Sequence, residues 1–272
     1  MTLSELEQAL FACWPRRYSA SWDNVGLQAG DPSAPVRRAL VSLDVTDAVA
    51  DEAARLGADC IISHHPLLFT PLRSVLAGGP GGLVYRLVRS GVGVISMHTN
   101  LDSAPGGLAD RFALQFLPSV TGVFGAEPDR PDVFYGRMGG IPPVPLSALL
   151  DSVRARLGGP LRYAGDPART VSVLALLCGG ARAEEAGQGT PEGVVDSLEL
   201  SGWQEEADAY ITADLGYHAF QRAVELGLAV VDAGHYQTEQ CAPVLLAEAV
   251  RRAAPAVEII ASAQADVIRF HA

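Results

Sequence analysis

The chain has 272 residues, 49% of them hydrophobic, and a formal net charge of −11 at pH 7. This length is enough for one large or two small domains, and the negative charge argues against nucleic acid as a partner, because an acidic surface repels phosphates. The four cysteines form no C-x-x-C pair, which excludes a thiolate zinc knuckle and a thioredoxin motif; they are Cys13, Cys60, Cys178 and Cys241.

Neither a signal peptide nor a membrane span is expected. Residues 1–5 are MTLSE, without the basic segment that opens a signal peptide. No apolar run approaches the roughly 18–20 residues that a membrane-spanning helix needs. We therefore expect a cytoplasmic globular protein.

The first elements are predicted in the order helix, loop, strand, helix. Thr2 and Glu5 fit a capping box in front of apolar residues at helical spacing. After a loop at residues 21–27, residues 38–44 are predicted as a strand. A helix then follows over 46–56, which Thr46 can cap and Gly57 can end.

A helix, a glycine, a continuously apolar strand and a histidine follow one another three times. The strands at 59–63, 92–97 and 228–232 precede His64 with His65, His98, and His235, respectively. Continuously apolar strands are typical of a parallel or mixed sheet buried between helices. Because crossovers are right-handed, the three strands are expected to run the same way. Their C-terminal ends would then meet at one edge, where open α/β sheets bind ligands.

A second α/β region is predicted between about Pro128 and Asp232, with strands at 171–177 and 209–212. We expect residues 1–127 plus 232–272 to form a metal-binding α/β domain and residues 128–231 to form the second. The segment Gly179–Trp203 is rich in Gly, Ala and Glu, and the sequence leaves its role open.

Asp102 and His98 each allow two interpretations. Asp102 lies four residues after His98, and it either binds a ligand or, like Ser103, caps a helix that begins at Pro105. His98 is either a functional residue or a hydrogen-bonded core histidine.

Glu239 is similarly ambiguous. It follows His235 at i, i+4 spacing, which places both side chains on one side of a helical turn. It is otherwise simply an acid at a helix N-terminus. Inside a helix Pro243 would clash with the carbonyl of Glu239, so we expect the regular helix to start near Cys241 with Glu239 in a turn before it.

Taken together, these residues favour a metal centre. Four of the six histidines follow apolar strands, two acids lie within four residues of them, and Asp44 ends a strand on the same predicted edge. Three or four imidazoles with two carboxylates exceed what one tetrahedral ion needs and suit two ions bridged by a carboxylate. Without thiolates the site favours Zn, Mn, Fe, Co or Ni over Cu(I).

The chain resembles the NGG-interacting-factor-like family of dinuclear metal proteins, often named GTP cyclohydrolase 1 type 2 homologues. Five stretches carry the resemblance: SWDNVGL (21–27), SLDVT (42–46), SHHP (63–66), HTNLD (98–102) and DAGHYQTE (232–239). They run nearly from end to end of the chain.

The resemblance implies two divalent ions per subunit. It puts His64 and His235 on one ion, His65 and Asp102 on the other, and Glu239 between them. It also implies two α/β domains with mixed, largely parallel sheets flanked by helices, with the metal site at strand C-terminal ends in the cleft between them. Family members form toroidal homohexamers with the metal sites facing the interior, and this chain resembles the short form without an inserted domain.

The resemblance also suggests that Asp214 and His218 lie near the site, although the family usually has glycine at Ala213 and lysine at Gly216. His98, Asp214 or His218 could move protons. We expect a hydrolase of a nucleotide or another phosphorylated small molecule. Cyclohydrolase chemistry itself is less well supported, because the chain has no zinc-thiolate arrangement and no P-loop.

Two other functions stay open. The first is a non-catalytic metal-binding, delivery or regulatory module that acts through partners. The second is a structural metal site, but such sites are usually closed by four protein ligands, whereas five ligands across two ions leave positions for water.

Overall fold

The structure is a computed structural model that describes residues 1–127, 130–180 and 207–269. The chain divides into two compact units: Met1–Ala104 with Ala242–Val267, and Pro105–Cys241 with the last C-terminal residues. The junctions lie after residues 104 and 241, whereas the sequence placed them after 127 and 231. The observed junctions differ because two elements expected in the first unit belong to the second. Strand β5 (Gly122–Glu127) pairs with β6, and helix α9 (His235–Glu239) packs against α5.

The first unit is built on a five-stranded sheet in the order β1-β4-β3-β2-β11. Its strands are β1 Gly26–Ala29, β2 Arg38–Ser42, β3 Cys60–Ser63, β4 Gly93–Ser96 and β11 Glu258–Ala261. All neighbours pair in parallel except β1 with β4. The prediction that β3 and β4 run the same way is confirmed, and their last residues, Ser63 and Ser96, lie opposite each other. Both strands are fully buried, as their apolar runs predicted.

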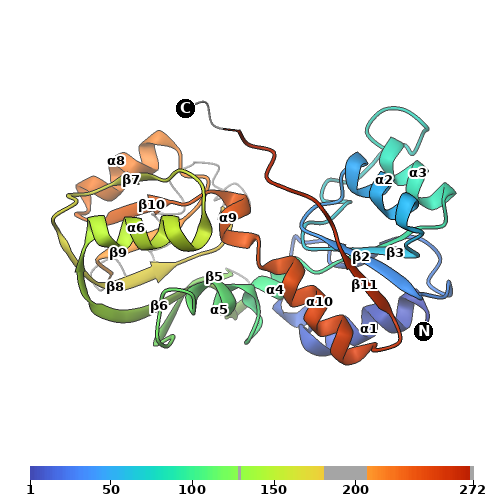
Figure 1. The fold of residues 1–272 in the computed structure, drawn as a ribbon, viewed down its shortest axis with the longest axis horizontal. Helices are drawn as coiled ribbons and strands as arrows, with labels where there is room; N and C mark the ends of the chain where they lie inside the picture. The colour runs from blue at the N-terminus through green and yellow to red at the C-terminus, as the bar shows by residue number, and fades with distance from the viewer. Residues whose placement is uncertain (128–129, 181–206, 270–272) are drawn as a thin grey trace. The chain divides into compact units, whose positions relative to one another are not determined.

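Helices cover both faces of this sheet. α2 (Asp47–Leu56) and α3 (Gly82–Arg89) lie on one face, and α1 (Leu3–Cys13) and α10 (Ala242–Ala253) on the other (Figure 1). The short helices η1 (Arg16–Tyr18) and α4 (Thr99–Ser103) lie in the loops. None of the helices in the described ranges is long and apolar enough to cross a membrane.

The predicted caps of this unit are confirmed. Thr2 and Glu5 form a reciprocal capping box, with N–H···O distances of 2.8 and 3.2 Å. The Thr46 hydroxyl accepts the backbone N–H of Val49, and Gly57 ends α2 in the left-handed conformation at φ 64°.

The second unit is built on a six-stranded mixed sheet in the order β5-β6-β8-β9-β10-β7. Besides β5, its strands are β6 Arg130–Pro145, β7 Arg162–Ala164, β8 Thr170–Leu176, β9 Ala209–Thr212 and β10 Ala229–Asp232. The three strands β8, β9 and β10 pair in parallel, and the outer pairs are antiparallel. Its helices are α5 Leu108–Ala113, α6 Leu146–Leu157, α8 Tyr217–Glu225 and α9.

The expectation that three histidine-bearing strands share one edge is wrong for the third strand. β10, which precedes His235, pairs with β9 in the second sheet, where Val230 lies opposite Tyr210. The reason is that α8 is the crossover between β9 and β10, so the chain returns beside the strand it has just left.

Each sheet has an aspartate in front of a buried strand that binds the start of the neighbouring strand. Asp59 Oδ2 accepts the backbone N–H groups of Arg37 and Arg38 at 2.7 and 2.9 Å. Asp208 Oδ2 accepts those of Ser172 and Val173 at the same two distances, and also the Ser172 hydroxyl. These carboxylates satisfy backbone donors at the sheet margin.

Asp208 gives a testable pH dependence. Burial alone would raise the pKa of Asp208, but the hydrogen bonds from Ser172 and Val173 and the charge of Arg169 outweigh it and hold the pKa below 3.8. A carboxyl group with a lowered folded-state pKa stabilises above its unfolded pKa and loses this contribution as pH falls through the folded value. Asp208→Asn should therefore lower the free energy of unfolding at pH 7 by about 1–2 kcal/mol, and the difference should shrink below about pH 4.

Thermal unfolding monitored by circular dichroism between pH 3 and pH 7 measures this effect. Asp151→Asn, at an exposed position on α6, is the matched control and should change the melting temperature little at any pH. A constant difference between wild type and Asp208→Asn over the whole range would contradict the assignment.

Candidate metal centre

The adjacent histidines follow β3, and His98 follows β4. Because the two parallel strands end side by side, the three rings meet at one sheet edge. The ring centroids are 4.9 Å apart for His64 and His65, and His98 lies 5.3 and 5.6 Å from them. One ligand nitrogen from each ring lies within 4.8 Å of the other two, so the three could hold a metal ion. His98, expected to move protons, thus lies within the donor group.

His64 is fully buried, and its tautomer follows from its partner. Its Nδ1 lies 2.9 Å from the carbonyl oxygen of Met97, which can only accept a hydrogen bond. Nδ1 therefore carries the proton in the neutral ring, and Nε2 carries the lone pair. Nε2 lies 3.5 Å from Asp102 Oδ1, a carboxylate oxygen suited to the same ion.

Asp102 does not cap a helix. It lies within α4, whose N-cap is His98, and the next helix, α5, begins after Gly107 rather than at Pro105. Its mostly buried carboxylate faces His64. The capping interpretation is therefore wrong, and the role of Asp102 as a metal ligand stays a prediction.

The ring of His65 is held by a carboxylate. Its Nδ1 lies 2.6 Å from Asp44 Oδ1, and Gln264 Nε2 donates to the other oxygen of Asp44, also at 2.6 Å. Gln264 Oε1 in turn accepts the backbone N–H groups of Leu43 and Asp44. The segment after β11 therefore holds Asp44, and Asp44 orients His65.

The ring of His98 is held in the same manner by Asp23, at 3.0 Å from Nδ1 to Oδ1. Asp23 Oδ2 accepts the backbone N–H and the hydroxyl of Thr99. Burial alone would raise the pKa of Asp23, but the hydrogen bonds from His98 and Thr99 outweigh it and hold the pKa below its usual value. Asp23 is thus an ionised, buried partner for the imidazole.

The second unit carries its own donor pair on α9. His235 Nε2 lies 3.0 Å from Glu239 Oε2, as their i, i+4 spacing predicted. The regular helix, α10, begins at Ala242, close to the predicted start near Cys241. Glu239, expected in a turn, is instead the last residue of the five-residue helix α9.

Asp214 orients His235. Its Oδ2 lies 2.7 Å from His235 Nδ1, and its backbone has φ 59°, a conformation that few residues other than glycine adopt. Burial alone would lower the pKa of His235, but the carboxylates of Asp214 and Glu239 outweigh burial and raise it to about 11. The two carboxylates therefore favour a positive charge at His235, either as a proton on the imidazole or as a metal ion bound to it.

Two glycines lie directly behind these carboxylates. A Cβ built on Gly179, which has φ 64°, would lie 2.1 Å from Glu239 Oε1, and one on Gly180 would lie 2.6 Å from Asp214 Oδ2. The Gly179 N–H also donates to Thr238 Oγ1 at 3.0 Å. A Cβ at either position would therefore displace the carboxylate that faces it. The rest of Gly179–Trp203, from residue 181 on, lies outside the described residues.

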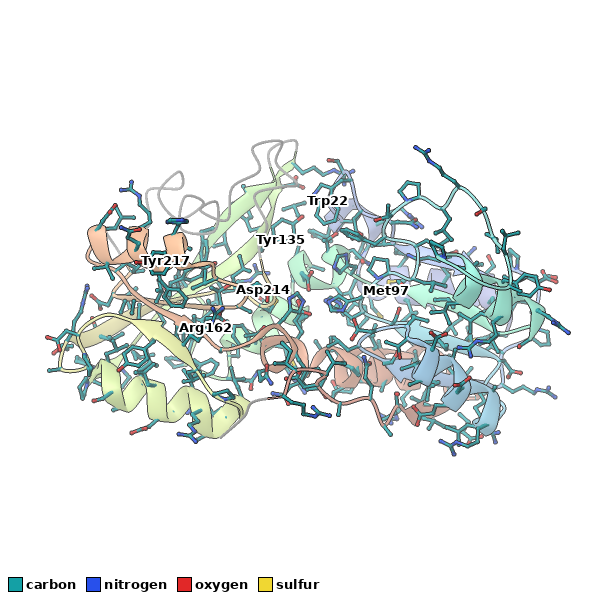
Figure 2. All side chains as sticks on the ribbon, turned by 90° about the horizontal axis from the view of Figure 1, so that it is seen from above. Trp22, Met97, Tyr135, Arg162, Asp214 and Tyr217 are labelled. Carbon is teal, nitrogen blue, oxygen red and sulfur yellow. The ribbon has the colours of Figure 1, made fainter. Side chains whose placement is uncertain are left out.

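His218 is not part of this donor group. It is exposed on α8, where its ring contacts that of Tyr217 at 5.4 Å. Figure 2 shows Tyr217 well apart from Asp214.

Four residues that support the site were not predicted from the sequence. Asp23 lies within the SWDNVGL stretch, whose only sequence signal is the family resemblance, and Gly179 begins a segment to which the sequence assigns no role. Gly180 and Gln264 carried no local signal, because each acts on a residue distant in sequence.

The donors in each unit are imidazole nitrogens and carboxylate oxygens, a set that fits a divalent ion such as Zn, Mn or Fe. The family model for Duf34/NIF3 (NGG1p interacting factor 3) matches residues 1–266. The chain belongs to the Duf34/NIF3 family.

Individual relatives agree with this assignment. A Streptomyces coelicolor protein named GTP cyclohydrolase 1 type 2 homolog is 32% identical over 246 residues, covering 87% of this chain and 81% of its own length. A solved Staphylococcus aureus hypothetical protein superposes with a TM-score of 0.82 at 23% identity, over 100% of this chain and 99% of that one. A Bacillus cereus protein related to NIF3 gives 0.80 at 21% identity, with the same coverage. These solved structures confirm the two-sheet α/β fold.

Gly179→Ala tests the close approach to Glu239. The carboxylate is the end of a flexible side chain, so we expect it to move and metal affinity to fall about 10- to 100-fold, while the fold is kept. Gly227→Ala is the matched control, since Gly227 has φ 69° and nothing within 4 Å of an added Cβ. Both variants carry the backbone cost of about 1–2 kcal/mol. Equal metal affinity of the two variants, measured by chelator competition, would contradict this role.

Asp44→Ala tests the support of His65. Loss of the carboxylate releases the ring, and metal affinity should fall about 10- to 100-fold. Asp47→Ala, which removes an exposed acid three residues away that pairs with Arg86, should leave affinity unchanged. Chelator competition gives the affinities, and melting temperatures verify that both variants fold. Unchanged metal affinity in folded Asp44→Ala would refute the orienting role.

Proposed function

We propose that this protein is a dinuclear-metal-dependent hydrolase that acts on a nucleotide or a related phosphorylated metabolite. In this proposal His64 and His235 bind one ion, His65 and Asp102 bind the other, and Glu239 bridges them. The family resemblance further supports a homohexamer.

One observation carries the proposal. All four candidate histidines have Nδ1 within 3.0 Å of a carbonyl or carboxylate oxygen; the partners are Met97, Asp44, Asp23 and Asp214. This arrangement is typical of metal-binding histidines, because it fixes the ring and directs Nε2 toward the ion. Histidines buried only for packing also need a hydrogen-bond partner, but nothing requires all of them to use Nδ1 for it.

When bound, two divalent ions supply Lewis-acid polarisation of a phosphoryl or carbonyl oxygen and an activated water. His98 is then the residue for proton transfer at Nε2, since Asp23 holds its other nitrogen. Asp214 acts by holding His235 Nδ1. His218, exposed on α8, stays a prediction as a third proton carrier.

Turnover after metal reconstitution tests this function. The protein is stripped of metal, loaded with Mn, Zn or Fe, and incubated with nucleotides and phosphorylated sugars. Glu239→Ala should lose both bound metal and turnover by about 100-fold or more. Glu225→Ala, which removes an exposed acid on α8, should keep both.

Metal content, measured by mass spectrometry, separates the alternatives. Tight and exchangeable metal binding without turnover on any substrate would replace the hydrolase with a metal-delivery or regulatory module. An unchanged metal content in Glu239→Ala would remove that residue from the centre.

A further inference from the structure

Two large aromatic side chains lie exposed on neighbouring loops of the first unit. Trp22 is 38% exposed and Phe69 is 51% exposed. Their ring centroids are 5.8 Å apart and their planes meet at 76°, so the two rings form a corner rather than a stack. Figure 2 labels Trp22 on the loop that precedes β1. Exposed aromatic pairs of this kind often mark a binding surface.

This aromatic pair lies against the candidate metal centre. The rings of Trp22 and Phe69 each have their centroid 6.2 Å from that of His98, in edge-to-face orientation. His98 in turn contacts His64 and His65. A molecule resting on the pair would therefore be next to the histidines.

Hydrogen bonds between the two loops hold the pair in place. Both backbone groups of Leu68, the residue before Phe69, are bound by side chains from the loop before β1 and from β1 itself. Its carbonyl accepts Asn24 Nδ2 and its N–H donates to Gln28 Oε1, each at 2.8 Å. Gln28 Nε2 also donates to the Asn24 carbonyl. Aromatic anchors fixed in this manner bind with a smaller loss of conformational entropy.

A corner of two rings suits a planar ring ligand. One aromatic face stacks on the ligand, and the other meets the ligand's edge. Aromatic side chains recognise nucleobases in this manner whatever the base, because every base has a π-face. A sugar phosphate without an aromatic ring would gain no binding energy from stacking on this surface.

We propose that Trp22 and Phe69 bind the nucleobase of a nucleotide substrate and set the rest of the molecule toward the histidines. This inference rests on the proposed function and narrows its substrate class to molecules with a planar heteroaromatic ring. It gives Trp22 and Phe69 a role that metal binding does not require.

Calorimetric titration of the metal-loaded protein with GMP and with ribose 5-phosphate tests the inference, since ribose 5-phosphate has a hydroxyl group where GMP has the base. Wild type should bind GMP more tightly. Trp22→Leu and Phe69→Leu should each weaken GMP binding, and the variant that removes the stacking ring should do so by about 5- to 150-fold, which corresponds to one lost base–aromatic stack. Trp22→Phe should keep most of the GMP affinity, and ribose 5-phosphate binding should be the same in all variants.

Tyr217→Leu is the matched control, because Tyr217 is 76% exposed on the second unit and should have no effect on GMP binding. Equal affinity of wild type for the two ligands, or leucine variants that bind GMP as wild type does, would overturn the inference. So would a changed oligomeric mass in the leucine variants, which would instead place a second copy on the pair.

The two proposals fail separately. Turnover of phosphates that lack an aromatic ring, without GMP binding, would overturn the base-binding role of Trp22 and Phe69 and leave the proposed hydrolase intact. Ring-dependent GMP binding with full metal content but no turnover would remove the hydrolase and leave the ring site.

Discussion

The candidate centre depends on how one nitrogen of each imidazole is held. A histidine ring turns about two side-chain bonds, so it presents Nε2 in a fixed direction only when Nδ1 is anchored. Here the anchors are three carboxylates and one main-chain carbonyl, all within 3.0 Å. Such carboxylates also raise the basicity of the ring, which strengthens its bond to a cation. The loops that carry these anchors are therefore as much part of the centre as the histidines themselves.

This constraint explains why distant parts of the chain converge on one sheet edge. Asp44 follows β2 and orients His65 after β3, which is possible because the two parallel strands end at the same level. Asp44 is itself held by Gln264, which lies 220 residues further on and beyond β11. Pairing of β11 with β2 thus completes the edge. The C-terminal segment consequently supports His65 through Asp44.

Local sequence patterns predicted the individual helices and strands, but they could not predict which strands pair when they lie far apart in the chain. The capping box at Thr2, the helix cap at Thr46, the apolar strands and the histidines at strand ends follow from spacing and composition, and the structure agrees at Thr2, Thr46 and β3. The same helix-glycine-strand-histidine pattern precedes His235, but a pattern does not say which sheet a strand joins. That choice is made by the parallel neighbour β9. The role of Gln264 could not be predicted for the same reason, since a single glutamine after a strand has no local signature.

The segment at residues 21–28, a loop that leads into β1, shows how a few residues can serve both a metal site and a small-molecule ligand. Asp23 points inward and holds His98, while the preceding Trp22 remains at the surface against the same ring. Asn24 and Gln28 then tie the loop to Leu68 and so fix the position of Phe69. Alternation of inward and outward side chains over these few residues links the ring surface to the orientation of His98. A substitution that shifts Trp22 is therefore expected to alter the orientation of His98 as well. A ligand bound on Trp22 would contact an imidazole that the same segment orients.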